Sequence, residues 1–127
     1  HKEIGWLPIE RTSEAGESFF ADILPKSIEV FHWHGDTFEL PNGAIHFARS
    51  TACENQGFII DNRILGLQFH LEMTPKTVQG MIDNCGHEIV DSPYIQPAKD
   101  MLSDSTRFDG TKDLMTSCLD QFCKDLL

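Results

Sequence analysis

A histidine and a carboxylate stand two residues apart in the segment GLQFHLE, residues 66–72, at the end of an apolar run. Because side chains alternate between the faces of a strand, His70 and Glu72 would lie on one face, opposite the apolar residues around them. A carboxylate beside an imidazole fixes its tautomer and stabilises the imidazolium, as a general base requires. The pair predicts two members of a catalytic triad, with a partly buried structural histidine as the alternative.

A second group with chemical potential is FHWHGD, residues 31–36, at the end of a predicted strand. His32 and His34 would share a strand face and could both bind zinc, and Asp36 follows closely enough to join them. A threonine follows the aspartate where hydrolytic metal sites of this kind usually carry a histidine. Two other interpretations stay open: a strand end packed by Trp33, and a loop that contributes to a substrate site.

Four cysteines occupy positions 53, 85, 118 and 123, and no two of them form a C-x-x-C pair. The spacing of the last two puts them on different faces of a predicted helix, which disfavours a disulfide between them. Since the N-terminus lacks the apolar core of a signal peptide, we expect reduced thiols and a cytoplasmic location.

Composition narrows the class of protein. A chain of 127 residues, 40% of them hydrophobic, is long enough for one domain with its own core. No apolar run approaches the length of about 18 residues that suggests a membrane span, so we expect no membrane association. The formal net charge of −10 disfavours nucleic acid as a partner, because phosphate binding needs clustered lysine and arginine.

The elements that would position these residues are strands first and helices afterwards. Runs of β-forming residues predict strands at 2–9, 27–33, 44–48, 57–60 and 63–70. The dipeptide Asp61-Asn62 is a strong hairpin-turn signal between the last two. This order indicates an α+β arrangement or the later half of an α/β fold, because a doubly wound domain would begin with βαβ alternation.

Helical patterns are expected at 18–24, 75–85, 98–102 and 112–127. Thr74 suits an N-cap, Pro75 suits the first helical position, and Gly86 supplies a stop. The last helix should dock on the core through one apolar stripe. That stripe comprises Leu114, Met115, Cys118, Leu119, Phe122 and Leu126.

Several of these stretches closely resemble signatures of class I, triad-type glutamine amidotransferases. Residues 66–72 resemble G-[VL]-Q-F-H-P-E, and HGD at 34–36 with LPNG at 40–43 resembles the H-G-D…L-P-x-G stretch of the GMP synthase-like branch. KEIGW at 2–6 and ACENQ at 52–56 are similar to the same branch. The resemblance covers about residues 2–85. It implies an α/β fold, namely the C-terminal part of a flavodoxin-like amidotransferase domain, with 86–127 as a helical tail.

The resemblance implies hydrolysis of the glutamine side-chain amide to glutamate and ammonia through a cysteinyl thioester. His70 would be the general base and acid, and Glu72 would orient it. Trp33, His34 and Asp36 would lie beside the glutamine pocket. No cofactor and no metal is expected. Glutamine or a γ-glutamyl compound would be the substrate, and a separate synthase subunit is a partner that the resemblance allows.

Two departures from the family pattern matter. Leu71 replaces the usual proline, which should be mild because His70 and Glu72 keep their spacing. The nucleophile elbow, G-x-C-x-G, should precede KEIGW and does not occur, and Cys53 and Cys85 lack its flanking glycines. We therefore expect a C-terminal portion that is inactive by itself, and that self-associates or pairs with the missing N-terminal half.

Two alternatives remain at this point. One is a metal-dependent hydrolase that uses His32, His34 and Asp36. The other is an amidotransferase-like binding module without catalytic activity.

Overall fold

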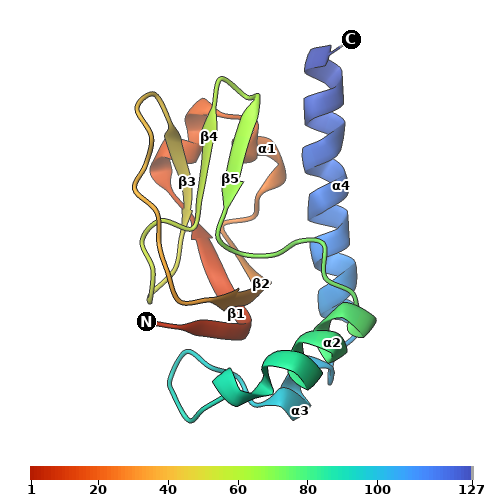
Figure 1. The fold of residues 1–127 in the computed structure, drawn as a ribbon. Helices are drawn as coiled ribbons and strands as arrows, with labels where there is room; N and C mark the ends of the chain where they lie inside the picture. The colour runs from red at the N-terminus through yellow and green to blue at the C-terminus, as the bar shows by residue number, and fades with distance from the viewer. Residues whose placement is uncertain (127) are drawn as a thin grey trace.

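The computed structural model describes residues 1–126, with side chains described up to residue 124. Within this range five strands form one sheet in the order β2-β1-β3-β4-β5, and every neighbouring pair is antiparallel (Figure 1). The strands are β1 (Glu3–Arg11), β2 (Ser27–His34), β3 (Ile45–Arg49), β4 (Gly57–Ile60) and β5 (Ile64–Leu67).

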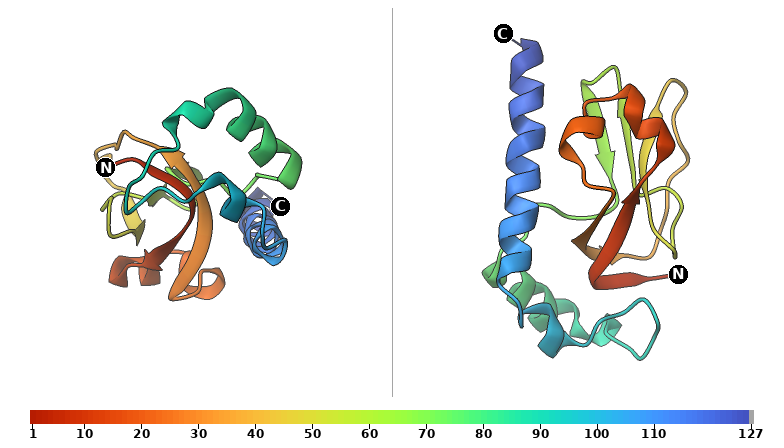
Figure 2. Two further views of the ribbon diagram at one scale, coloured as in Figure 1. Left: turned by 90° about the horizontal axis from the view of Figure 1, so that it is seen from below. Right: turned by 180° about the vertical axis from the view of Figure 1, so that it is seen from behind.

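Helices follow the sheet along the chain, as the sequence predicts. The short elements η1 (Ser13–Glu17) and α1 (Phe20–Ile23) lie between β1 and β2 in sequence. The later elements are α2 (Pro75–Cys85), η2 (Gly86–Glu88), α3 (Ala98–Met101) and α4 (Thr106–Leu126). Figure 2 shows α4 running along one side of the sheet, while α2 and α3 gather at the end where β1 begins. No helix within residues 1–126 is both long and apolar enough to cross a membrane.

The buried apolar side chains form two core clusters. The first joins the sheet to η1, α1 and α4, and Phe20 stacks on Phe47 within it at a centroid distance of 3.8 Å. The second joins β1 and β2 to the later helices, and Trp6 lies at its centre with edge-to-face contacts to Phe31 and Phe108. Each cluster buries residues from both halves of the sequence, so the helical tail belongs to the core.

Predicted turns and helix starts that depend on a short stretch of sequence are confirmed. Asp61 and Asn62 have φ values of 52° and 54°, which is the type I′ geometry that joins antiparallel strands. Thr74 and Thr77 form a reciprocal capping box at the start of α2. Gly86 does not end that helix in a left-handed conformation; it stays right-handed, at φ −58°, and the chain continues into η2.

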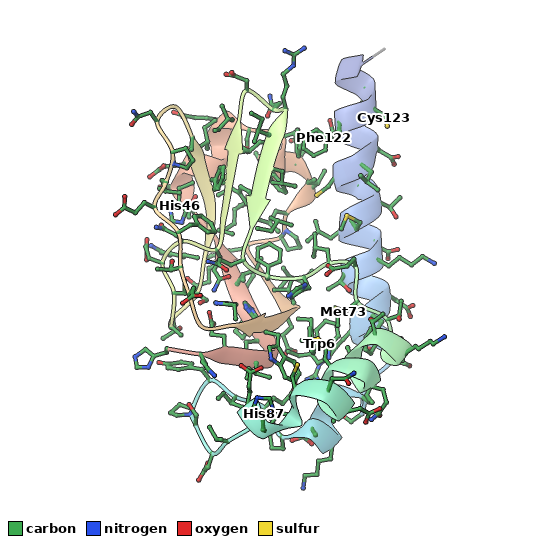
Figure 3. All side chains as sticks on the ribbon, in the orientation of Figure 1. Trp6, His46, Met73, His87, Phe122 and Cys123 are labelled. Carbon is green, nitrogen blue, oxygen red and sulfur yellow. The ribbon has the colours of Figure 1, made fainter. Side chains whose placement is uncertain are left out.

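The helix predicted at 112–127 begins earlier, at Thr106, and its buried stripe is different. Asp104 accepts hydrogen bonds from the backbone N–H and the hydroxyl of Thr106, which stabilises the earlier start. Leu119 was expected in the stripe and is 54% exposed. Phe122 points from α4 toward the sheet and Cys123 points away (Figure 3). The Leu126 side chain lies outside the described part of the chain.

Gly5 allows the helical tail to cross β1 at close range. Its φ is +106°, a conformation that side chains other than glycine rarely adopt. A Cβ atom there would lie 2.5 Å from the Cβ of Gln96. Gln96 bonds to β1 on both sides of this glycine, donating its N–H to Ile4 O and accepting the Trp6 N–H at its Oε1.

The substitution Gly5→Ala should therefore lower the free energy of unfolding by at least about 2 kcal/mol, because it adds backbone strain to a steric clash. Gly80→Ala is the matched control. Gly80 lies in α2 with open space around it, and alanine should stabilise the helix by about 0.5–1 kcal/mol. Urea denaturation of both variants measures the difference, and equal effects at the two positions would contradict this account.

Candidate functional site

The structure brings His70 and Glu72 together. The His70 Nδ1 lies 2.6 Å from the Glu72 Oε1, a short charge-assisted hydrogen bond at a partly exposed position. The carboxylate can only accept, so the proton sits on Nδ1 and the lone pair of Nε2 remains available. An imidazole in this tautomer can take a proton from a thiol or a water molecule.

The strand that should carry this pair is shorter than predicted. It was expected to run to residue 70, but β5 ends at Leu67, and His70 makes only an isolated antiparallel bridge to Phe31. In that bridge the His70 N–H donates to the Phe31 carbonyl at 2.8 Å. The ladder to β4 ends because β4 begins at Gly57, opposite Leu67. The pairing of imidazole and carboxylate is thus achieved by an irregular segment that is anchored on β2.

The loop at 34–36 lies against the same segment. The Gln68 side-chain amide donates to the Asp36 carbonyl at 3.1 Å. The His34 Nδ1 lies 3.3 Å from the same carbonyl. The Asp36 carbonyl therefore links the loop at 34–36 to the segment that carries His70, and His34 contacts the same carbonyl.

Trp33 faces the helical tail. Its indole N–H donates to Glu88 at 3.0 Å, and Lys2 bonds the other oxygen of the same carboxylate. These two donors hold the pKa of Glu88 below its usual value. The indole N–H that could have bound a ligand is thus already used inside the chain.

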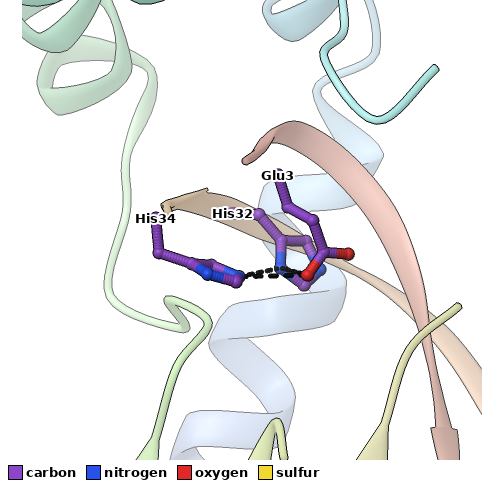
Figure 4. A group of neighbouring side chains, drawn as sticks. All are labelled: Glu3, His32 and His34. Atoms are coloured by element: carbon purple, nitrogen blue, oxygen red, sulfur yellow. Dashed lines mark hydrogen bonds and ion pairs between the residues drawn. The ribbon is translucent and has the colours of Figure 1, made fainter. Parts of the chain in front are cut away.

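Glu3 is the buried residue around which His32 and His34 gather, and sequence reasoning gave it no role. The His34 Nε2 lies 3.1 Å from the Glu3 Oε1 and 3.4 Å from the His32 Nδ1 (Figure 4). Gln56 donates to the same Glu3 oxygen at 2.6 Å, and Ser50 donates to the other at 2.9 Å. The sequence offered one signal for this role, a glutamate at the start of an apolar strand, because a buried charge at such a position needs polar partners.

Burial and the hydrogen-bond partners set the charges in this cluster. Burial alone would raise the pKa of Glu3, but the hydrogen bond with His34 and the interaction with His32 bring that pKa below its usual value. Burial lowers the pKa of His32 to about 4, so its imidazole is neutral at pH 7. The hydrolase interpretation that used Asp36 as third ligand is wrong in this respect, because among residues 1–126 it is Glu3 that joins the two histidines.

Two surface cavities flank these residues. One, of about 390 Å³, lies between the segment at 71–75 and α4, and Glu72 lines it. The other, of about 260 Å³, is lined by Gly35, Asp36 and the segment at 52–55. The loop at 34–36 therefore borders a hollow, as a substrate-site role requires.

Two of the cysteines have surroundings that the structure describes. Cys53 contacts the Thr37 hydroxyl and the Asn55 carbonyl. Cys118 is buried in the core, and burial raises its pKa to about 11. All four cysteines are free thiols.

Comparison with known proteins identifies similar sequences and folds. Residues 7–89 match the family model described as glutamine amidotransferase class-I. A curated glutamine amidotransferase-like protein of Salmonella typhimurium, YfeJ, is 32% identical over 91 residues, which cover 72% of this chain and 38% of that protein.

Solved structures extend the similarity over the helical tail. A crystal structure of a glutamine amidotransferase from Methylobacillus flagellatus matches with a TM-score of 0.86 at 27% identity, over 98% of this chain and 53% of that one. A glutamine amidotransferase from Thermotoga maritima matches with a TM-score of 0.77 at 33% identity, over 95% of this chain and 50% of that one. This chain thus spans about half the length of these structures, and less of the curated relative.

The contact between His70 and Glu72 predicts a measurable change in acid titration. Partial burial raises the pKa of Glu72, but the hydrogen bond and the charge of His70, together with backbone N–H donors, outweigh the burial and hold that pKa below its usual value. Because this pKa is lower in the folded chain, the interaction stabilises the fold above the unfolded-state pKa, and the stabilisation is lost as pH falls through the folded-state value.

His70→Ala should therefore raise the Glu72 pKa, as measured by NMR titration of the carboxyl carbon. Glu88, whose partners are Trp33 and Lys2, serves as the internal control and should not change. An unaltered Glu72 pKa in this variant would show that the hydrogen bond does not form in solution.

Proposed function

Because this chain belongs to the class I glutamine amidotransferase family, we propose that His70 and Glu72 are the base and the orienting carboxylate of a glutaminase site. The observation that carries the proposal is the 2.6 Å hydrogen bond from the His70 Nδ1 to Glu72. It leaves the Nε2 atom as the base. The cysteine thiol would come from a part of the protein outside these 127 residues, in keeping with the half-length match to the relatives.

The proposed reaction assigns one proton path to His70. Its Nε2 takes the proton of the thiol, and the thiolate attacks the side-chain carbonyl carbon of glutamine. The C–N bond breaks as the imidazolium returns that proton to the departing ammonia. Water then attacks the thioester with His70 as its base, the C–S bond breaks, and glutamate and the thiol are released.

Glu72 would keep the imidazole in the reactive tautomer throughout this cycle and stabilise its charged form. The loop at 34–36 would border the glutamine pocket. Asp36 supports this role because its carbonyl accepts a hydrogen bond from Gln68, in the segment that carries His70, and His34 contacts the same carbonyl. Trp33 would contribute packing, since its N–H is bonded to Glu88. In the full protein the ammonia could pass to a separate synthase subunit, or the substrate could be a γ-glutamyl compound.

The same proposal includes association of the chain with other parts of its protein. β5 is an edge strand, and Ile64 on it is 58% exposed. An edge strand with an exposed apolar side chain favours pairing with another chain segment. The occupant that we propose is the N-terminal half of the amidotransferase domain, with a second copy of this chain as the substitute when that half is absent.

The isolated 127-residue chain should release no ammonia from glutamine beyond the background rate. A coupled glutamate dehydrogenase assay measures this, with His70→Ala as the reference. Ammonia release that depends on His70 would show that a thiol within this chain serves as nucleophile, and Cys53→Ser and Cys85→Ser would then identify it.

The gene sequence upstream of the His1 codon should encode a G-x-C-x-G elbow. In the protein that includes that segment, His70→Ala should reduce kcat by about 10²–10⁴-fold, the usual contribution of a general base. His87→Ala, at an exposed position, should leave kcat unchanged. An upstream sequence without the elbow would instead favour a non-catalytic binding module.

A further inference from the structure

Three potential ligand atoms converge in the cluster of Glu3, His32 and His34. The His32 Nε2 lies 3.2 Å from the Leu7 carbonyl, which accepts only, so the proton of a neutral His32 is on Nε2. The His34 ring has an acceptor at each nitrogen: its Nε2 lies 3.1 Å from the Glu3 Oε1 and its Nδ1 lies 3.3 Å from the Asp36 carbonyl. Without a cation, Nε2 donates to Glu3; a cation that takes the place of this proton leaves the proton of His34 on Nδ1, toward Asp36, and then meets lone pairs from His32 Nδ1, His34 Nε2 and Glu3.

The separations of these three atoms match a metal ion in size. The pairs lie 3.4 Å (His32 Nδ1 to His34 Nε2), 3.1 Å (His34 Nε2 to Glu3 Oε1) and 4.0 Å (His32 Nδ1 to Glu3 Oε1) apart. A circle through three points with these separations has a radius of about 2.1 Å, which is the distance at which zinc binds imidazole nitrogen and carboxylate oxygen. A tetrahedral ion at this distance needs ligand separations of about 3.4 Å, so two of the pairs fit as they stand, and the 4.0 Å pair has to close by about 0.6 Å when the ion binds.

The groups around the cluster are placed as the outer-sphere partners of a metal site usually are. Metal-binding histidines donate their other ring N–H to a backbone carbonyl or carboxylate, which orients the ring. Here both histidines have a backbone carbonyl in that place. The carboxylate of Glu3 is held in turn by Gln56 and Ser50. Figure 4 shows the two rings and the carboxylate pointing toward one common centre.

We propose that Glu3, His32 and His34 form a binding site for a divalent transition-metal ion, with zinc as the best fit. Two imidazoles and one carboxylate are a zinc ligand set, and a water molecule suffices for the fourth position of a tetrahedral ion. The three side chains are nearly inaccessible to solvent, which favours a structural ion. It would join β1 to the end of β2, next to the loop at 34–36.

This inference does not rest on the proposed glutaminase chemistry. His70 and Glu72 are not ligands, so His70→Ala should bind zinc as the unmodified chain does. If the glutaminase proposal is wrong, the metal site is unaffected. If no metal binds, the roles proposed for His70 and Glu72 are unaffected.

The test is zinc binding to the purified 127-residue chain, measured by competition with a chromogenic chelator and by elemental analysis after removal of excess ion. One equivalent should bind, and it should raise the thermal midpoint of unfolding. His34→Ala should weaken binding by more than about tenfold, because loss of a ligand exceeds the typical cost of losing an outer-sphere partner. His87→Ala and Cys53→Ser are matched controls that should retain full affinity.

If a ligand variant fails to fold, NMR of the unmodified chain still tests the proposal. Long-range proton–nitrogen spectra of the unmodified chain should show zinc shifting Nδ1 of His32 and Nε2 of His34, two different ring positions in one site. Binding that is no tighter than that of folded His34→Ala, or zinc-induced shifts confined to other histidines, would overturn the proposal.

Discussion

A carboxylate without access to water must be surrounded by hydrogen-bond donors. Glu3 imposes this requirement on the end of the sheet where β1 begins. Its partners come from separate parts of the chain: His34 from β2, and Ser50 and Gln56 from the connection between β3 and β4. The register of β1 with β2 places Glu3 directly opposite His34. Satisfying one buried charge therefore fixes how three segments meet.

The candidate catalytic segment is connected to this centre through main-chain and side-chain bonds. The Gln56 carbonyl accepts the Gln68 N–H at 2.9 Å, while its side chain holds Glu3. Gln68 in turn reaches the Asp36 carbonyl, which His34 also contacts. His70 follows two residues later and is fixed on β2 by its own N–H. The position of the imidazole thus depends on a network that extends well beyond its carboxylate partner.

Sequence reasoning succeeds where a few neighbouring residues determine the structure. The turn at Asp61-Asn62 and the start of α2 at Thr74 are of this kind, and so is the recognition of the motif around His70. It fails where a distant contact decides. β5 stops at Leu67 because its partner strand ends, and Leu119 is exposed because the sheet selects a different stripe of α4. Glu3 received no role because its partners lie 29 or more positions away along the chain.

The contacts between β1 and the tail have a consequence for the order of folding during synthesis. The Trp6 indole donates to the Met101 carbonyl, 95 residues further on, and Gln96 closes over Gly5 from 90 residues beyond Trp6. The first strand of this chain therefore leaves the ribosome long before the residues that cover it. Until residue 101 has emerged, Trp6 and Phe31 present apolar surface of the kind that chaperones recognise. This core therefore cannot be completed before residue 101 has been synthesised, however early the hairpin of β1 and β2 forms.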